Sequence, residues 1–179
     1  YTYTSLQNIL NSSGIKVSKN TLIEFTKMLE EAFLIFLVER FQPKVKEILR
    51  SPKKVYTVDT GLVRFFAPRF TKDFGRLMEN CVFLELKRRG NEEIFYYRSN
   101  EKEVDFLIRE GLKVKQLVQV TYASSRSEVD RREIKALLKA SKELKCKNLL
   151  VITWDYEGEE RIDRREIKFI PLWKWLLKI

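Results

Sequence analysis

The spacing of apolar residues divides the chain into two parts near residue 66. In the first part, residues 4–14 and 18–32 carry apolar side chains at intervals of three and four, which predicts two short helices. Residues 33–41 and 55–59 are rich in aromatic and β-branched side chains, which predicts two strands separated by a polar stretch. Two helices followed by a β-hairpin form the layout of a winged helix.

The second predicted helix has a clear start and two distinct faces. Ser18 is suited to cap its N-terminus, because a serine oxygen can accept a hydrogen bond from a free backbone N–H of the first turn. Leu22, Phe25 and Leu29 fall on one face, which we expect to pack inward. The residues left on the outer face are Lys19, Asn20 and Lys27.

The second part begins with a helix over residues 74–90 that is apolar almost all the way round and is closed by Gly90. After it, the pattern predicts three consecutive strands, a helix, a further strand and a final helix. These elements fall at residues 94–98, 103–108, 116–122, 127–145, 148–154 and after Pro171.

The predicted elements define the fold class and the domains. We expect an α+β and α/β protein in which residues 1–66 form a winged helix-turn-helix domain. Residues 67–179 are expected to form a second domain with a mixed β-sheet flanked by helices.

Composition narrows the possible chemistry. The chain has 44% hydrophobic and 34% charged residues, which is typical of a globular protein. It has no histidine, and Cys81 and Cys146 form no CxxC pair, so zinc hydrolases and serine triads are excluded. No apolar run reaches the roughly 18 residues of a membrane span and there is no signal peptide, so we expect a cytoplasmic protein without a membrane partner.

Charge points to a polyanionic partner. The 35 Lys and Arg residues exceed the 25 Asp and Glu residues, and the net charge of +10 favours DNA over an acidic protein surface. The alternative is a surface that is charged all over, as in many thermophile proteins rich in Lys and Glu. The candidate nucleic-acid contacts are Lys19, Asn20 and Lys27 on the second helix and Lys44, Lys46, Arg50, Lys53 and Lys54 between the predicted strands.

Three short stretches of the second part carry a family resemblance. "GRLMEN", "EVDF" and "LVQVTY", in the order helix, second strand and third strand, resemble the restriction-endonuclease-like, or PD-(D/E)xK, fold. The resemblance implies a Mg²⁺ site with Glu79, Asp105 and a third-strand acid, followed two residues later by a lysine that positions the attacking water. Here Gln119 and Thr121 occupy those last two positions.

The resemblance therefore implies a degenerate catalytic site made of Glu79, Asp105, Gln119 and Thr121. Gln119 still has a carbonyl oxygen to offer a metal beside Glu79 and Asp105, but Thr121 does not replace an ammonium group. We therefore expect Mg²⁺ as a cofactor only if these positions still form an intact metal site. The alternative is an active Mg²⁺-dependent DNA endonuclease with a displaced lysine, for which Lys113 and Lys115 are the nearest candidates.

A wider resemblance covers nearly the whole chain. "TLIEFTKMLEEAFLIFLVERF", "SPKKVYTVDTGL" and "GRLMENCVFLELKRRG" resemble the C-terminal half of an archaeal and bacterial family of AAA-type P-loop ATPases. No GxxxxGK[ST] occurs, so ATP is expected only through a module upstream of Tyr1, which would also be a partner of this region. The expected function is a DNA-binding regulatory region without cleavage activity. A third possibility is an interaction module that docks the ATPase or an oligomer partner.

Overall fold

The computed structural model describes residues 1–66, 74–100 and 102–178. The chain divides into two compact units, Tyr1–Ala67 and Pro68–Ile179, each of which is considered by itself. We refer to them as unit 1 and unit 2.

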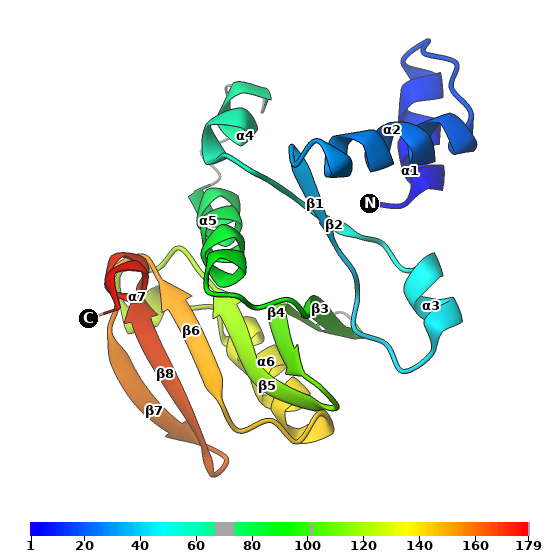
Figure 1. Ribbon diagram of the computed structural model, residues 1–179. Coiled ribbons are helices and arrows are strands. Elements are labelled where there is room, and N and C mark those ends of the chain that lie inside the picture. Colours follow the sequence, from blue (N-terminus) through cyan, green and yellow to red (C-terminus); the bar gives the residue numbers. More distant parts are fainter. Residues whose placement is uncertain (67–73, 101, 179) are drawn as a thin grey trace. The chain divides into compact units, whose positions relative to one another are not determined.

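Unit 1 contains two helices, a two-stranded antiparallel sheet and two shorter helices (Figure 1). Ser18 caps the second helix as expected, because its side chain accepts a hydrogen bond of 3.0 Å from the backbone N–H of Thr21. The two strands pair with Ile35 opposite Thr57 and Val38 opposite Lys54. The elements are α1 (Tyr3–Ser12), α2 (Lys19–Glu31), β1 (Ile35–Val38), α3 (Val45–Arg50), β2 (Lys54–Thr57) and α4 (Thr60–Phe66).

The connection between β1 and β2 differs from the expected basic loop. It contains the helix α3, whose sequence VKEILR is rich in good helix formers and carries Glu47 in its first turn and Arg50 in its last. The apolar face of α2 also differs from the expectation. Leu22 is buried, whereas Phe25 is 56% and Leu29 is 41% exposed.

Unit 2 is built on a six-stranded mixed sheet with the strand order β3-β4-β5-β6-β8-β7. The strands β3, β4 and β5 form an antiparallel meander, β6 adds parallel to β5, and β8 adds parallel to β6. The strands are β3 (Ile94–Ser99), β4 (Lys102–Glu110), β5 (Lys113–Val120), β6 (Leu149–Thr153), β7 (Gly158–Ile162) and β8 (Arg165–Pro171). The helices are α5 (Phe74–Arg88), the short 3-10 helix η1 (Arg126–Glu128), α6 (Arg131–Glu143) and α7 (Leu172–Leu177).

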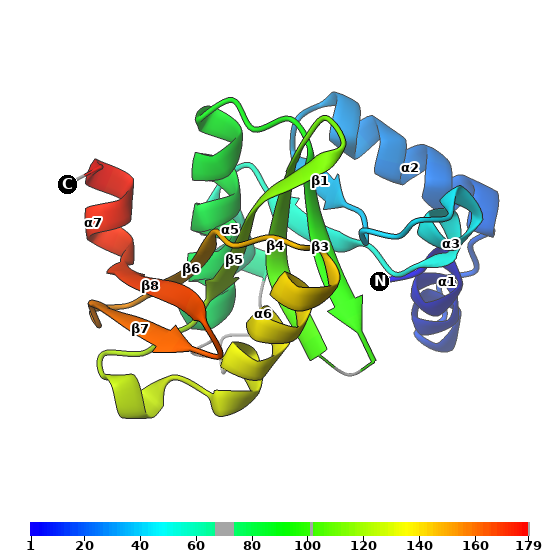
Figure 2. The same ribbon diagram turned by 90° about the horizontal axis from the view of Figure 1, so that it is seen from below.

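Two helices cover the two faces of this sheet. Figures 1 and 2 show the sheet between α5 and α6 from two directions. The Phe83 ring of α5 stacks on the Phe106 ring of β4, with centroids 6.4 Å apart. Ile134, Leu137 and other side chains of α6 are buried. Both faces are therefore packed, which explains why the central strands have continuous apolar runs.

The hairpin of β7 and β8 was not expected. It is rich in charged residues, including Glu159 paired with Lys168, and β7 forms the edge of the sheet, where solvent faces one side. The final helix after Pro171 lies where the sequence predicts it. Across the described ranges 1–66, 74–100 and 102–178, none of the helices has both the length and the apolar character needed to cross a bilayer.

Candidate functional site: a buried carboxylate–amide cluster

Asp105 lies in the middle of β4 and is bonded to the neighbouring strand. Its Oδ2 accepts a hydrogen bond of 2.7 Å from Gln119 Nε2 and a second one of 3.0 Å from the backbone N–H of Val120. Phe106 pairs with Val118, so Asp105 and Gln119 come opposite each other and share the other face of the sheet. Both residues are buried, with exposed fractions of 7% and 6%.

Thr121 and Glu133 extend this arrangement along the same face. Thr121 lies two residues after Gln119, is buried, and donates its backbone N–H to the Ile152 oxygen at 2.9 Å. Its side chain lies near the carboxylate of Glu133, in the first turn of α6, and lowers the pKa of that carboxyl. We call Asp105, Gln119, Thr121 and Glu133 the carboxylate–amide cluster.

Two oxygens of the cluster have unmet hydrogen-bonding capacity. Within the described part of the chain, Gln119 Oε1 and Glu133 Oε2 are buried and have no hydrogen-bond partner. Burial raises the pKa of Glu133 to about 7; the Thr121 side chain lowers it, and the nearby charges of Asp105 and Asp130 raise it further. Protonation of Glu133 removes one of the two negative charges of Asp105 and Glu133. This lowers the free-energy cost of burying the two carboxyl groups together.

Glu79 belongs to a different part of unit 2. It lies on α5, and Phe83 of this helix packs on Phe106, which points away from the face of Asp105. Among the described residues, Glu133 of α6 is a helix carboxylate whose charge interacts with that of Asp105. Glu85, the other acid of α5, is buried and accepts hydrogen bonds from Arg88 Nε at 2.6 Å and Arg89 Nε at 2.7 Å. These arginines hold its pKa at about 2.

Glu133 was absent from the sequence prediction. As an acid three residues after Asp130, the N-cap of α6, it looks like an ordinary first-turn residue that complements the helix dipole. The sequence does contain one indication of its position. The next residue, Ile134, is the first of the buried residues of α6, so Glu133 borders the face of the helix that packs inward.

The cluster does not fit a divalent cation. Oδ2 of Asp105 already accepts two N–H donors, and Glu133 is partly protonated near neutral pH. Among the residues the structure describes, no group of three or more His, Cys, Asp and Glu side chains is arranged to hold a metal. Mg²⁺ favours several anionic oxygens in near-octahedral geometry, which these contacts do not supply.

The two lysines that the sequence offers as displaced candidates, Lys113 and Lys115, lie away from the cluster. Lys115 lies at the start of β5, at a register shift opposite Ile108 and Arg109, and its Nζ is 3.2 Å from Glu110 Oε2. It lies four positions before Gln119 along the strand, a distance of about 13 Å. Lys113 is further away along the same strand and is exposed. Neither lysine lies where it could position a water beside Asp105.

The candidate DNA contacts of unit 1 lie on its helices and strand ends. Lys19, Asn20 and Lys27 are exposed on α2, and Lys27 Nζ is 3.5 Å from Glu31 Oε1. Lys46 and Arg50 are exposed on α3.

Three further candidates flank α3 and have different surroundings. The exposed Lys44 precedes α3, and its Nζ is 3.4 Å from Glu47 Oε1. Lys53 is more enclosed, and its Nζ is 3.0 Å from Glu39 Oε1. Lys54 opens β2 and is half-buried.

These features define a mixed α/β domain with a hydrogen-bonded carboxylate–amide cluster inside its sheet, preceded by a small helical unit with a two-stranded sheet. Residues 74–175 match the family described as "Domain of unknown function (DUF4143)", and the chain belongs to this family. Residues 1–73 match a second family, described as "Domain of unknown function (DUF8612)".

Two curated relatives match nearly the whole chain. "Uncharacterized protein MJ1544" of Methanocaldococcus jannaschii is 41% identical over 181 residues, which cover 96% of this chain and 40% of that protein. An "Uncharacterized protein" of Haemophilus influenzae is 28% identical over 170 residues, covering 95% of this chain and 40% of that protein. The chain thus spans about 40% of the length of these relatives.

The pKa of Glu133 predicts how the stability of unit 2 varies with pH. Its folded-state pKa of about 7 lies above the ordinary value of 4.5. Its contribution to stability is therefore complete below pH 4.5 and is lost as the pH rises towards 7. Although Oε2 is buried, Glu133 as a whole is only half-buried, so we expect a loss of about 1 to 2 kcal/mol rather than the full value of the shift.

Denaturant unfolding at several pH values checks this effect. In Glu133→Gln this loss should be absent, so the stability of the variant relative to the wild type should rise between pH 4.5 and 7.5. Glu92→Gln, on an exposed residue before β3, is the matched control and should follow the wild-type profile. Parallel profiles for wild type and Glu133→Gln would show that Glu133 does not titrate in this range.

Proposed function

We propose that this chain is the DNA-binding C-terminal region of an AAA-type ATPase. Unit 1 serves as a winged helix, and unit 2 is a PD-(D/E)xK-like domain that no longer cleaves DNA. The observation that carries the DNA-binding part is the set of exposed basic side chains on α2 and α3, of which Lys46 and Arg50 lie on α3 and Lys19 and Lys27 on α2. Such cations neutralise backbone phosphates without regard to base sequence.

The loss of cleavage activity is supported by the cluster in unit 2. Asp105 accepts hydrogen bonds from Gln119 and Val120, and Thr121 lies near Glu133. A nuclease of this class needs anionic metal ligands and an ammonium group beside them. Here the side chains at the same positions are hydrogen-bonded within the protein. Unit 2 therefore has a structural role, and any catalysis takes place in another module.

The upstream ATPase module is part of the same proposal. The relatives are more than twice as long as this chain, which leaves room for such a module in them. In this arrangement ATP binds upstream of Tyr1, and the region described here targets the ATPase to DNA.

The second candidate function is an interaction module, and a specific observation favours it. Phe25, Met28 and Phe33 lie on or just after α2 and are 56%, 59% and 68% exposed. Large apolar side chains that are exposed together are typical of surfaces that bind another protein. In this reading, α2 docks the upstream module or a second copy of the chain, and the basic residues have no nucleic-acid partner.

Binding of duplex DNA, measured against salt concentration, separates these two functions. If α2 and α3 contact several phosphates, log K should fall with log[salt] with a slope of roughly −3 to −6, at about −0.9 per phosphate. The control is an acidic polypeptide of similar length, which should bind much more weakly. Absence of DNA binding at low salt would overturn the proposal and favour the interaction module.

A further inference from the structure

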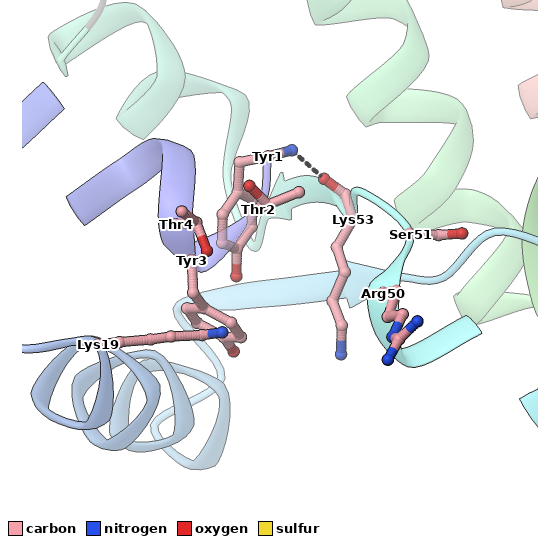
Figure 3. A pocket seen from close by; sticks show the side chains of 8 residues that line it. All are labelled: Tyr1, Thr2, Tyr3, Thr4, Lys19, Arg50, Ser51 and Lys53. Carbon is pink, nitrogen blue, oxygen red and sulfur yellow. Dashed lines mark hydrogen bonds between the residues drawn. The ribbon is translucent and has the colours of Figure 1, made fainter. Parts of the chain in front are cut away.

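Unit 1 contains a pocket of about 260 Å³ between the start of α1, the start of α2 and the segment from α3 to β2. Three of the residues that line it are cations from α2, from α3 and from the segment before β2, namely Lys19, Arg50 and Lys53. In Figure 3 the cationic ends of Lys53 and Arg50 extend to the same side of the pocket, and Lys19 reaches across from α2. None of the described residues that line the pocket is acidic.

A backbone hydrogen bond holds one wall of this pocket in place. The Lys53 N–H donates to the Tyr1 oxygen at 2.8 Å. The rings of Tyr1 and Tyr3 meet edge to face with centroids 5.6 Å apart. The wall thus combines aromatic surface with fixed backbone next to the cations.

The pocket keeps a positive balance despite nearby acids. Glu39 lies 3.0 Å from Lys53 Nζ and offsets that charge, but it does not line the pocket. Arg50 and Lys19 remain, and the hydroxyl of Ser51 adds a neutral hydrogen-bonding group to the lining. Two cations and hydroxyl groups around one small volume are suited to an oxyanion with several acceptor oxygens.

We propose that this pocket binds a phosphomonoester, of the kind carried at the end of a DNA strand. Internal phosphodiesters of a duplex form a continuous backbone that a convex surface contacts from one side. A terminal phosphate projects from the strand and can enter a pocket, where it meets cations from several directions. The volume exceeds that of a phosphate group alone, which leaves room for the adjoining sugar against Tyr1 or Tyr3.

This inference rests on the proposed function, because it takes unit 1 to bind DNA and names the strand end as the part of the DNA that enters the pocket. The test compares two blunt duplexes of the same sequence, one with 5′-phosphates and one with 5′-hydroxyl groups, by fluorescence anisotropy at fixed salt. Charge-assisted hydrogen bonds to the added phosphate should make the phosphorylated duplex bind at least roughly ten-fold more tightly.

Single substitutions locate the effect. Lys19→Gln and Arg50→Gln should each remove most of the preference for the phosphorylated duplex. Lys16→Gln, an exposed lysine of unit 1 outside the pocket, removes the same charge and should keep the preference. Thermal melts of each variant establish that the chain is folded; a preference that survives in both folded pocket variants would overturn the proposal.

Two further outcomes distinguish the possible failures. Equal, salt-dependent binding of both duplexes would overturn the phosphate pocket and leave the DNA-binding function intact. If neither duplex binds, both the phosphate pocket and the DNA-binding function are overturned.

Competition with inorganic phosphate and with adenosine 5′-monophosphate tests the source of the phosphate. Displacement of the phosphorylated duplex by equimolar nucleotide would show that the pocket serves a free nucleotide and would overturn the strand-end assignment.

Discussion

Replacement of Asp105 by alanine should lower the free energy of unfolding of unit 2 by about 2 to 4 kcal/mol. The substitution leaves Gln119 Nε2 and the Val120 N–H without their acceptor in a buried part of the sheet. Denaturant unfolding followed by tryptophan fluorescence measures the change, because Trp154, Trp173 and Trp175 are the three tryptophans of the chain and all lie in unit 2.

A matched control and a cleavage assay sharpen this result. Asp163→Asn removes the charge of an exposed carboxylate that lies 3.0 Å from Lys142 Nζ and keeps a side chain suited to the positive φ of this position, so it should change the stability by less than about 1 kcal/mol. Neither wild type nor Asp105→Ala should cut plasmid or branched DNA with Mg²⁺ or Mn²⁺. Metal-dependent cleavage that disappears in Asp105→Ala would make Asp105 a catalytic ligand and contradict its structural role.

Replacing Lys27, Lys44 and Lys46 together by alanine should weaken duplex binding by roughly 10- to 100-fold at low salt. These side chains lie on α2 and around α3, are exposed and do not line the phosphate pocket. Each lost phosphate contact should also reduce the magnitude of the slope of log K against log[salt] by about 0.9. The ion pairs of Lys27 with Glu31 and Lys44 with Glu47 are on the surface, so the variant should remain folded.

A triple variant of unit 2 controls for the change in net charge. Lys102, Lys135 and Lys147 are exposed there, and their replacement by alanine removes the same number of charges. If both triple variants lose affinity equally, binding depends on the overall charge of the chain and not on α2 and α3. Unchanged affinity in the Lys27, Lys44 and Lys46 variant would move the DNA contact elsewhere.

Sequence alone determined the elements whose pattern is local. The first two helices of unit 1, the capping role of Ser18, the long helix over residues 74–90 and the three-stranded meander follow from apolar spacing and helix-capping chemistry. Alternation along β5 was also sufficient to place Gln119 and Thr121 on one side of the chain. Each of these inferences depends on residues a few positions apart, so it needs no knowledge of the rest of the fold.

The tertiary structure alone decided what surrounds those residues. The order of β6, β8 and β7, the bond from Gln119 to Asp105, the approach of Glu133 and the pocket at Lys19 all join segments that are far apart in the sequence. A short sequence window reports which side of an element a residue occupies, but not which element packs against that side. Burial then changes the chemistry: Glu133, an ordinary acid in the sequence, acquires a pKa of about 7 because α6 carries it out of water and next to Asp105.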